Sequence, residues 1–372
     1  MTSPGSALTR WRRKIEHADR ETVALVLIVK ALLLIFAVQT FTASAEAYPG
    51  ALAIWDRWDA THYVHLSEHG YAGAGKDRVL LAFFPFYPWL VRACAFVVRD
   101  TLTAAFVVSG IASIAAALLL RRLSELDQSP SVARASVWFL AIFPTTYFLH
   151  IPYTESLFLA LTLGCIVAAR RDQWMLAGVL GGCAALTRIN GLVLIPVLAT
   201  EAFLVWRSRR RFDPRWLASG AVGVGFLGYL WLNQHVAGDP LAFAHIQEQH
   251  WYHTLMPPWV GISQVWLRIG DINAIESLHE FIYIVLTLVC TVWCWVKLRP
   301  SYAVWMTCNW LLITCNSFII SVPRYALTFF PIFILLARLG TRRPLAFGSV
   351  TIFSVLFLAL YVQRFVHRLW AF

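Results

Sequence analysis

Long apolar runs constrain this chain more than any other feature of its sequence. Residues 22–41, 101–120 and 216–234 each approach or exceed the roughly 20 residues that an α-helix needs to cross a bilayer. Only 14% of the 372 residues are charged, against about 25% in a typical soluble domain. The runs are solid and lack the period-two alternation of a membrane β-barrel. The sequence therefore predicts an all-α polytopic membrane protein forming a single domain over 1–372.

The apolar runs predict about eleven spans, with boundaries defined to within several residues. The run 83–98 is not counted among them, because it is short and carries Pro85, Pro88 and Arg92. We expect it to lie at the surface as a juxtamembrane helix. The expected spans are 22–41, 101–120, 132–149, 154–169, 174–188, 190–206, 216–234, 278–296, 301–320, 325–339 and 345–362.

The distribution of charge indicates which loops lie on which side of the membrane. With the N-terminus inside, the inner segments hold 20 Lys and Arg against 8 Asp and Glu, whereas the outer segments hold 10 against 12. This asymmetry follows the positive-inside rule, and it would be lost if 83–98 also crossed. Lys30, within the first span, is the remaining basic residue. We therefore expect a cytoplasmic N-terminus and two large outer loops, 42–100 and 235–277, that carry the chemistry.

The first outer loop concentrates acids and histidines. On a helix, Asp59, His62, His65 and His69 lie roughly on one face. Three interpretations compete: an amphipathic surface helix, a histidine-box metal centre, and a site with a carboxylate base. A histidine box needs paired His-His motifs and normally faces the cytoplasm, and this stretch meets neither condition. The second outer loop adds His245, Glu248, His250 and His253 in "HIQEQHWYH".

Aromatic and basic residues favour the carboxylate interpretation. Trp55, Trp58, Tyr63, Tyr71 and Tyr87 flank the acids, as stacking residues do in sugar sites. Isolated arginines stand at two expected outer helix ends, and an ionisable group there is by default a functional hypothesis. The planar guanidinium suits phosphate because it binds two oxygens at once, although each arginine could instead extend to lipid headgroups. These arginines are Arg188 in "LTRING" and Arg324 in "VPRYALTFFP".

Several motifs in order resemble the PIG-V family of membrane mannosyltransferases, which add the second mannose to GPI anchors. The most specific is "WDATHYVHLSEHGY" (58–71), followed by "LAFFPFYP" (81–88). The resemblance covers most of the chain. It implies a GT-C glycosyltransferase fold with juxtamembrane helices in a catalytic first outer loop, and a polyprenyl-phosphate sugar donor. The later motifs are "YTESLFLAL" (153–161), "ALTRINGL" (185–192), "GDPLAF" (238–243) with "HW" (250–251), and "PRYALTFFPIF" (323–333).

The same resemblance assigns roles to individual residues. The family's Trp-Asp dipeptide falls on Trp58 and Asp59, so Asp59 is the expected catalytic base and Asp56 is spare. A base and a cation are sufficient chemically, because polyprenyl phosphate is already a good leaving group. Direct displacement would invert the anomeric centre. The expected substrate-binding residues are Trp58, His62, Glu68, His69, Tyr87, Glu155, Arg188, Asn190, His250 and Arg324.

The expected partners are the lipid-linked sugar donor, a glycan or glycolipid acceptor and membrane lipids. The net charge of +11 follows the topology, so no nucleic-acid partner is expected. No cofactor is predicted, since the lipid-linked sugar is a substrate, and a role for a divalent ion stays open. The arginine-rich composition and a length below that of eukaryotic members indicate a bacterial inner membrane. A lipid or solute transporter is the main alternative, favoured by the charge of Lys30 within a span.

Overall fold

The computed structural model describes residues 4–44, 46–270 and 274–372, and the side chains of 16–44, 46–270 and 275–372. The basic side chains from Arg10 to Lys14, which contribute to the predicted topology, lie outside the described residues. Within the described part, all regular elements are helical, apart from an isolated antiparallel β-bridge between Leu255 and Asn316. The predicted all-α fold class is confirmed.

A helix occupies each predicted span. Five helices of the described residues are long and apolar enough to cross a membrane, or six if a bent pair at 76–98 is counted as one span. Several of the others are shorter than the predicted spans. In chain order the helices are α1 (Pro4–Thr42), α4 (Thr101–Glu125), α5 (Pro130–Ala141), α6 (Glu155–Arg170), α7 (Trp174–Ala185), α8 (Leu194–Arg209), α9 (Ala221–Ala237), α12 (Ala274–Lys297), α13 (Pro300–Thr314), α15 (Pro331–Arg342) and α16 (Pro344–Val366).

The shorter helices stop within the fold and continue as buried irregular chain. The predicted spans 132–149 and 301–320 were too long, since α5 ends at Ala141 and α13 at Thr314. Pro144 lies just beyond the end of α5, where a proline removes a backbone donor and disfavours the helical conformation of the residue before it. Irregular backbone at membrane depth is tolerated where protein surrounds it or where it lines a cavity. The segments 142–154, 186–193 and 315–330 are mainly irregular and contain only short helices: η3 (Thr146–Leu149), η4 (Ile189–Val193) and α14 (Val322–Ala326).

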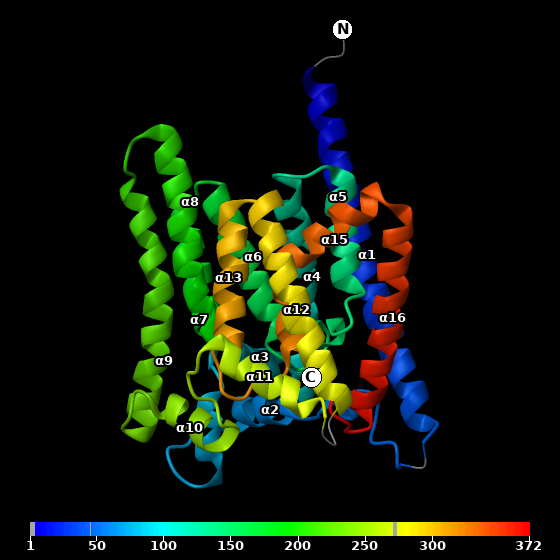
Figure 1. Cartoon of the computed structure of the whole chain (residues 1–372), viewed down its shortest axis with the longest axis vertical. Helices are drawn as coiled ribbons and strands as arrows, with labels where there is room; N and C mark the ends of the chain where they lie inside the picture. The colour runs from blue at the N-terminus through cyan, green and yellow to red at the C-terminus, as the bar shows by residue number, and fades with distance from the viewer. Residues whose placement is uncertain (1–3, 45, 271–273) are drawn as a thin grey trace.

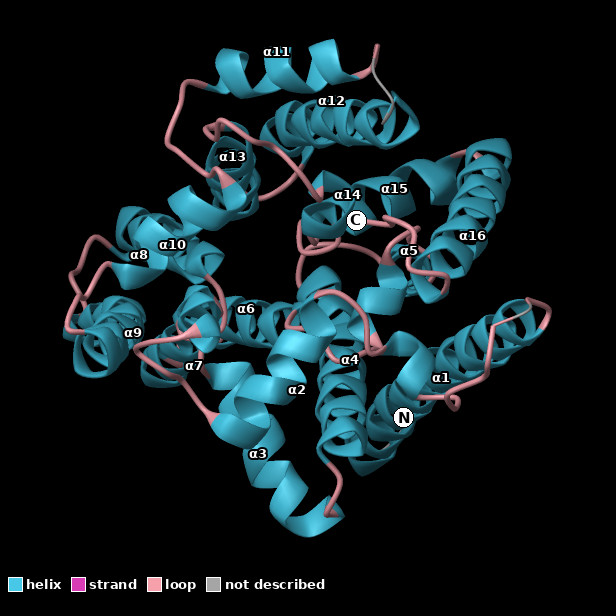
Figure 2. Cartoon of the chain, turned by 90° about the horizontal axis from the view of Figure 1, so that it is seen from below, coloured by secondary structure: helices cyan, strands magenta, loops and turns pink. Residues whose placement is uncertain are grey.

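Four helices gather at one end of the molecule, the lower end in Figure 1, together with the C-terminus. Seen from below, α2 and α3 lie across the ends of the longer helices (Figure 2). The 3₁₀ helix η2 (Lys76–Ala82) meets α3 at a bend of 110°. This arrangement agrees with the juxtamembrane position expected for 83–98. The four helices are α2 (Asp59–His69), α3 (Phe86–Val98), α10 (Ala242–Trp251) and α11 (Pro258–Arg268).

Small residues allow the helices to approach closely. A Cβ atom on Gly225 of α9 would lie 2.1 Å from the carbonyl oxygen of Gly182 on α7, so this crossing requires glycine. Close contact between backbones is the usual basis of helix association in membranes, where there is no hydrophobic force between helices. Gly191 has a similar function in the segment after α7, because a Cβ there would lie 2.4 Å from the backbone nitrogen of Ala185.

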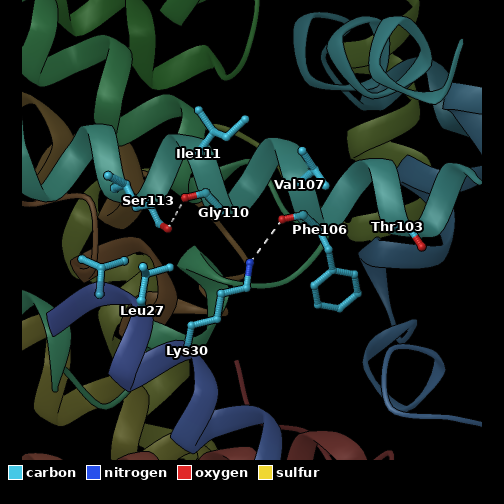
Figure 3. A pocket seen from close by; sticks show the side chains of 10 residues that line it. Leu27, Lys30, Thr103, Phe106, Val107, Gly110, Ile111 and Ser113 are labelled. Carbon is cyan, nitrogen blue, oxygen red and sulfur yellow. Dashed lines mark hydrogen bonds between the residues drawn. The ribbon is translucent and has the colours of Figure 1, made fainter. Parts of the chain in front are cut away.

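Lys30 lies in a cleft of about 270 Å³ between α1 and α4 (Figure 3). Its ammonium group donates to the backbone carbonyl of Phe106 at 3.3 Å and lies 5.9 Å from the centre of the Phe106 ring. Gly110 leaves room for the ammonium group, because a Cβ there would be 2.7 Å from Nζ. Lys30, the residue that favoured the transporter alternative, therefore joins α1 to α4 by a hydrogen bond to a backbone carbonyl.

Candidate active site

A cavity of about 790 Å³ opens at the end of the molecule where α2 and α10 lie. Its walls come from segments far apart in the sequence, including the three irregular segments and the last residues of the chain. Helices α5 and α13 stop before the end of the molecule at which α2 and α10 lie, and the chain that follows each of them lines this space. Seven of the predicted site residues line the cavity: Trp58, Asp59, His62, Arg188, Asn190, His250 and Arg324.

A chain of four charged side chains crosses the cavity floor. The Arg324 guanidinium donates through Nη1 to Asp59 Oδ2 at 2.7 Å and through Nε to Glu155 Oε1 at 2.5 Å. Arg188 donates through Nη1 to the same Glu155 oxygen at 2.5 Å and to Thr154 Oγ1 at 3.0 Å. Four segments far apart in the sequence are thus joined by alternating charges whose sum is zero.

The four charges differ in their exposure. The Glu155 side chain is fully buried, those of Arg188 and Arg324 are about one-tenth exposed, and that of Asp59 is 33% exposed. Removing one partner of such a buried pair typically costs about 3–5 kcal/mol, because the other charge stays uncompensated. Of these four charged side chains, that of Asp59 is therefore the most accessible to solvent or to a substrate.

Both arginines retain donors for a ligand. Within the described residues, Arg324 Nη2 and the Nε and Nη2 groups of Arg188 have no protein hydrogen-bond partner. Arg324 lies over the rings of Tyr153, at 4.5 Å, and Phe148, at 5.1 Å, which supports the cation from below. Unused guanidinium donors at a cavity wall are suited to an anion with several oxygens, such as a phosphate.

The residue before Asp59 has an unusual backbone. Trp58 has φ 53° and ψ −126°, which is a strained conformation for a bulky side chain. The Thr61 hydroxyl donates to the Trp58 carbonyl at 2.8 Å, and Trp370 meets the Trp58 ring edge-on at 5.4 Å. Strain of this kind costs about 1–3 kcal/mol and gathers at functional sites. It starts α2 abruptly at Asp59, so that the carboxylate lies at a helix N-terminus, where the dipole favours negative charge.

The loop 235–277, which was predicted to be the second outer loop, forms another wall of the cavity. From α10, Gln247 and Trp251 line the cavity beside His250, and His253 follows the helix. His253 Nδ1 lies 2.9 Å from Gln247 Oε1, and burial lowers the pKa of His253. Ser317 and Thr254 join this loop to the segment 315–321 through hydrogen bonds of 2.7 to 3.0 Å. The loop is thereby held against the segment that leads to Arg324.

Three predicted site residues do not reach the cavity. Glu68 is nine residues after Asp59, which on an α-helix is half a turn away from it, so the two point in opposite directions. His69 is near the far end of α2, about 15 Å along the helix from Asp59. Tyr87 is buried and forms hydrogen bonds to α4, at 2.9 Å from Ser109 Oγ and 3.3 Å from the Ala105 carbonyl.

Glu155 and Asn190 lie deeper than expected. Glu155 stands behind the two arginines and holds both, so a substrate would meet the arginines first. Asn190 donates to Asn309 Oδ1 at 2.7 Å from the cavity wall. Among the described residues, His, Cys, Asp and Glu form no group of three or more that could hold a metal ion.

Sequence reasoning missed several cavity residues. Tyr153 is the first residue of the motif "YTESLFLAL" but was not predicted to be a site residue. Its ring lies against the Arg324 guanidinium. Gln247 and His253 lie in "HIQEQHWYH" (245–253), from which only His250 was predicted as a site residue. The position of this stretch as a cavity wall depends on tertiary contacts. The C-terminal residues Trp370 and Phe372 return to the cavity with no local pattern that could predict it.

Residues 84–231 match the family model described as dolichyl-phosphate-mannose-protein mannosyltransferase. A GPI mannosyltransferase 2 from Yarrowia lipolytica is 27% identical over 266 residues, covering 64% of this chain and 70% of that protein. The GPI alpha-1,6-mannosyltransferase 2 of Mus musculus is 30% identical over 166 residues, covering 40% of this chain. The chain spans 32% of the length of this mouse relative.

The fold is similar to that of ArnT from Cupriavidus metallidurans, solved bound to undecaprenyl phosphate. The TM-score is 0.53 at 15% identity, over 87% of this chain and 62% of that one. The chain thus has the fold of the GT-C membrane glycosyltransferases, and its sequence is similar to those of mannosyltransferases. Its sequence is similar to those of GPI-anchor mannosyltransferases, in agreement with the expected resemblance to the PIG-V family. The family resemblance and the enzyme class predicted from the sequence are confirmed.

Proposed function

We propose that this protein transfers mannose from a polyprenyl-phosphate donor to a hydroxyl group of a lipid- or protein-linked glycan, with inversion and with Asp59 as the base. The observation that carries the proposal is the contact between Asp59 and Arg324 in one cavity. This contact sets a partly exposed carboxylate beside guanidinium groups that have free donors. The matched family's name and the undecaprenyl phosphate on ArnT support a donor of this chemical class.

The proposed step is a single displacement. The acceptor oxygen forms a bond to the anomeric carbon while the bond from that carbon to the phosphate oxygen breaks, and its electron pair stays on the phosphate. The hydroxyl proton passes to the Asp59 carboxylate. The free donors of Arg188 and Arg324 bind the phosphate oxygens and stabilise the charge that develops there. One base and one cationic site are sufficient for this reaction.

The ion pair between Asp59 and Arg324 links donor binding to the base. While Arg324 Nη1 donates to Asp59 Oδ2, this oxygen is occupied by the guanidinium and is not free to accept the proton of the acceptor hydroxyl. A donor phosphate that binds Arg324 competes for this guanidinium and weakens its bond to Asp59. The base then becomes available when the donor is in place.

Aromatic side chains provide the surfaces for the sugars. Trp58 is 43% exposed and lines the cavity together with Trp370, Tyr325 and Trp251. Rings of this size bury much apolar area and leave polar edges for hydroxyl groups. His62 and His250 supply hydrogen-bonding nitrogen atoms on the same walls. We propose that this site faces outward from a bacterial inner membrane, as the charge distribution predicts.

The test is transfer of labelled mannose from polyprenyl-phosphate mannose in membranes from cells that lack the gene, which supply unmodified acceptor. We expect Asp59→Ala to remain folded and to lose transfer by at least ~100-fold, the scale of a lost catalytic base. Asp56→Ala, which removes a carboxylate three residues before Asp59, is the matched control and should retain transfer. Normal transfer by Asp59→Ala would disprove the role of the base. Solute flux without transfer in the wild type would favour the transporter.

A further inference from the structure

Arg324 lies in α14 (Val322–Ala326), a short helix whose start is held from another part of the chain. The residue before this helix, Ser321, has a left-handed backbone (φ 65°, ψ 25°), and its side chain forms no capping hydrogen bond. The first N–H groups of a helix need an acceptor from outside the helix. In α14 that acceptor is Glu280, from α12.

Glu280 binds two consecutive backbone donors. Its Oε1 accepts from the Ser321 amide at 2.6 Å and its Oε2 from the Val322 amide at 2.7 Å. The Glu280 side chain is 3% exposed and is not among the residues that line the cavity. A buried carboxylate that accepts with both oxygens fixes the position and direction of the backbone it binds.

Further contacts hold the chain on either side of this point. Arg268 of α11 donates to the Ile319 carbonyl at 2.7 Å and lies 4.7 Å from the centre of the Phe318 ring. The Thr145 hydroxyl donates to the Pro323 carbonyl at 2.9 Å. Of the contacts that hold this stretch of backbone, the one from Glu280 comes from a helix long and apolar enough to cross a membrane.

We infer that Glu280 is a positioning residue, which acts through the backbone of 321–322 to hold the Arg324 guanidinium between Asp59 and Glu155. Arg324 follows Val322 by two residues, and its side chain must reach two carboxylates with different nitrogen atoms. A rotation at the start of α14 would move both bonds at once. The expected effect of Glu280 on catalysis rests on the proposed function. Its effect on the position of α14 rests on the two hydrogen bonds alone.

The variant Glu280→Gln tests the inference, because the new NH₂ group cannot accept from one of the two amides. We expect hydrogen exchange in peptides covering 316–326 to become at least about tenfold faster, since an opening that was suppressed becomes accessible. We expect kcat for mannose transfer to fall about tenfold, with the KM for the acceptor nearly unchanged. The control is Glu201→Gln, which alters an equally buried glutamate at the other end of the helices.

A double-mutant cycle separates positioning from a general loss of stability. If Glu280 acts through Arg324, adding Glu280→Gln to Arg324→Lys should lower transfer by less than about twofold further. Independent, multiplying losses would overturn the inference, and so would unchanged exchange in 316–326 or the same exchange pattern in Glu201→Gln. A wild-type protein without transfer would refute the proposed function, while the exchange comparison would still decide whether Glu280 holds α14.

Discussion

Buried Arg and Glu side chains form two clusters at opposite ends of the helices, and the clusters differ in how completely their acceptors are used. In the inner-end cluster (Glu201, Arg299 and Ser301), at the end predicted to face the cytoplasm, Arg299 binds both Glu201 oxygens at 2.7 Å, and the Ser301 hydroxyl donates to Glu201 Oε1 at 2.5 Å. In the cavity cluster (Asp59, Glu155, Arg188 and Arg324), two arginines share one oxygen of Glu155. The other oxygen of Glu155, Oε2, is buried and has no hydrogen-bond partner among the described residues.

This difference distinguishes a structural ion pair from a binding site. Paired and fully hydrogen-bonded charges have little capacity left for a ligand. In the cavity cluster the arginines keep free N–H groups and Glu155 keeps a free oxygen, which is costly in a buried site unless a substrate or water occupies it. We therefore expect the same substitutions to have different effects at the two ends.

The largest expected difference concerns the two arginines. Arg324→Lys removes the planar fork that reaches Asp59 and Glu155 with separate nitrogen atoms, and a lysine cannot replace it. We expect transfer to fall about 100- to 1,000-fold, the scale of a lost donor to developing negative charge. Arg299→Lys should change transfer less than about threefold. Comparable losses in both variants, measured with equal amounts of folded protein, would contradict a special role for the cavity cluster.

The next expected difference is in the free energy of unfolding of two variants, Glu155→Gln in the cavity cluster and Glu201→Gln in the inner-end cluster. Glu155→Gln leaves Arg188 and Arg324 without the carboxylate between them, and we expect a loss of about 3–5 kcal/mol in the free energy of unfolding. Glu201→Gln should cost less, because the Arg299 side chain is 27% exposed and can be hydrated. Thermal unfolding in detergent measures both variants. A larger loss for Glu201→Gln would reverse the comparison.

All four residues of the cavity cluster were predicted from the sequence to be site residues. Which of their side chains bind one another could not be predicted. Arg188 and Arg324 stood out as charges at the ends of apolar runs, and the Trp-Asp motif marked Asp59. Nothing local could show that Glu155 lies behind both arginines, because this depends on where α6 begins relative to α14. The same holds for Glu280, whose position in a predicted span gave no indication of the backbone it binds.

The fold shows the same limit. Apolar runs located a helix for each predicted span, but hydropathy does not distinguish a buried irregular segment from a helix. Residues 142–149 and 315–320 are as apolar as the helices before them, and so they were included in the predicted spans. Pro144 lies just beyond the end of α5, whereas no proline lies near the end of α13, where the chain that follows lines the cavity. The return of Trp370 to Trp58 is a long-range contact that no sequence period encodes.

The smallest expected difference is in how the stability of the two ends of the molecule depends on pH. Burial lowers the pKa of His253, so the unfolded chain takes up its proton first, and stability is lost as pH falls below the ordinary value of 6.5. At the inner end, burial raises the pKa of Asp127, but hydrogen bonds and charge from Arg170 and Tyr302 outweigh it and lower the pKa overall. The stability from that carboxylate is therefore complete above 3.8 and is lost only as pH falls below it.

Mild acid should accordingly loosen the cavity wall while the inner end stays intact. Between pH 7.5 and 5.5 we expect faster hydrogen exchange, after correction for the intrinsic pH dependence, in 242–256 and no change in 121–134. The substitution His253→Asn should remove this pH dependence, because an amide does not titrate in this range. Equal acceleration at both ends would show that acid acts on the whole fold. Acceleration that persists in His253→Asn would assign it to another group in the wall.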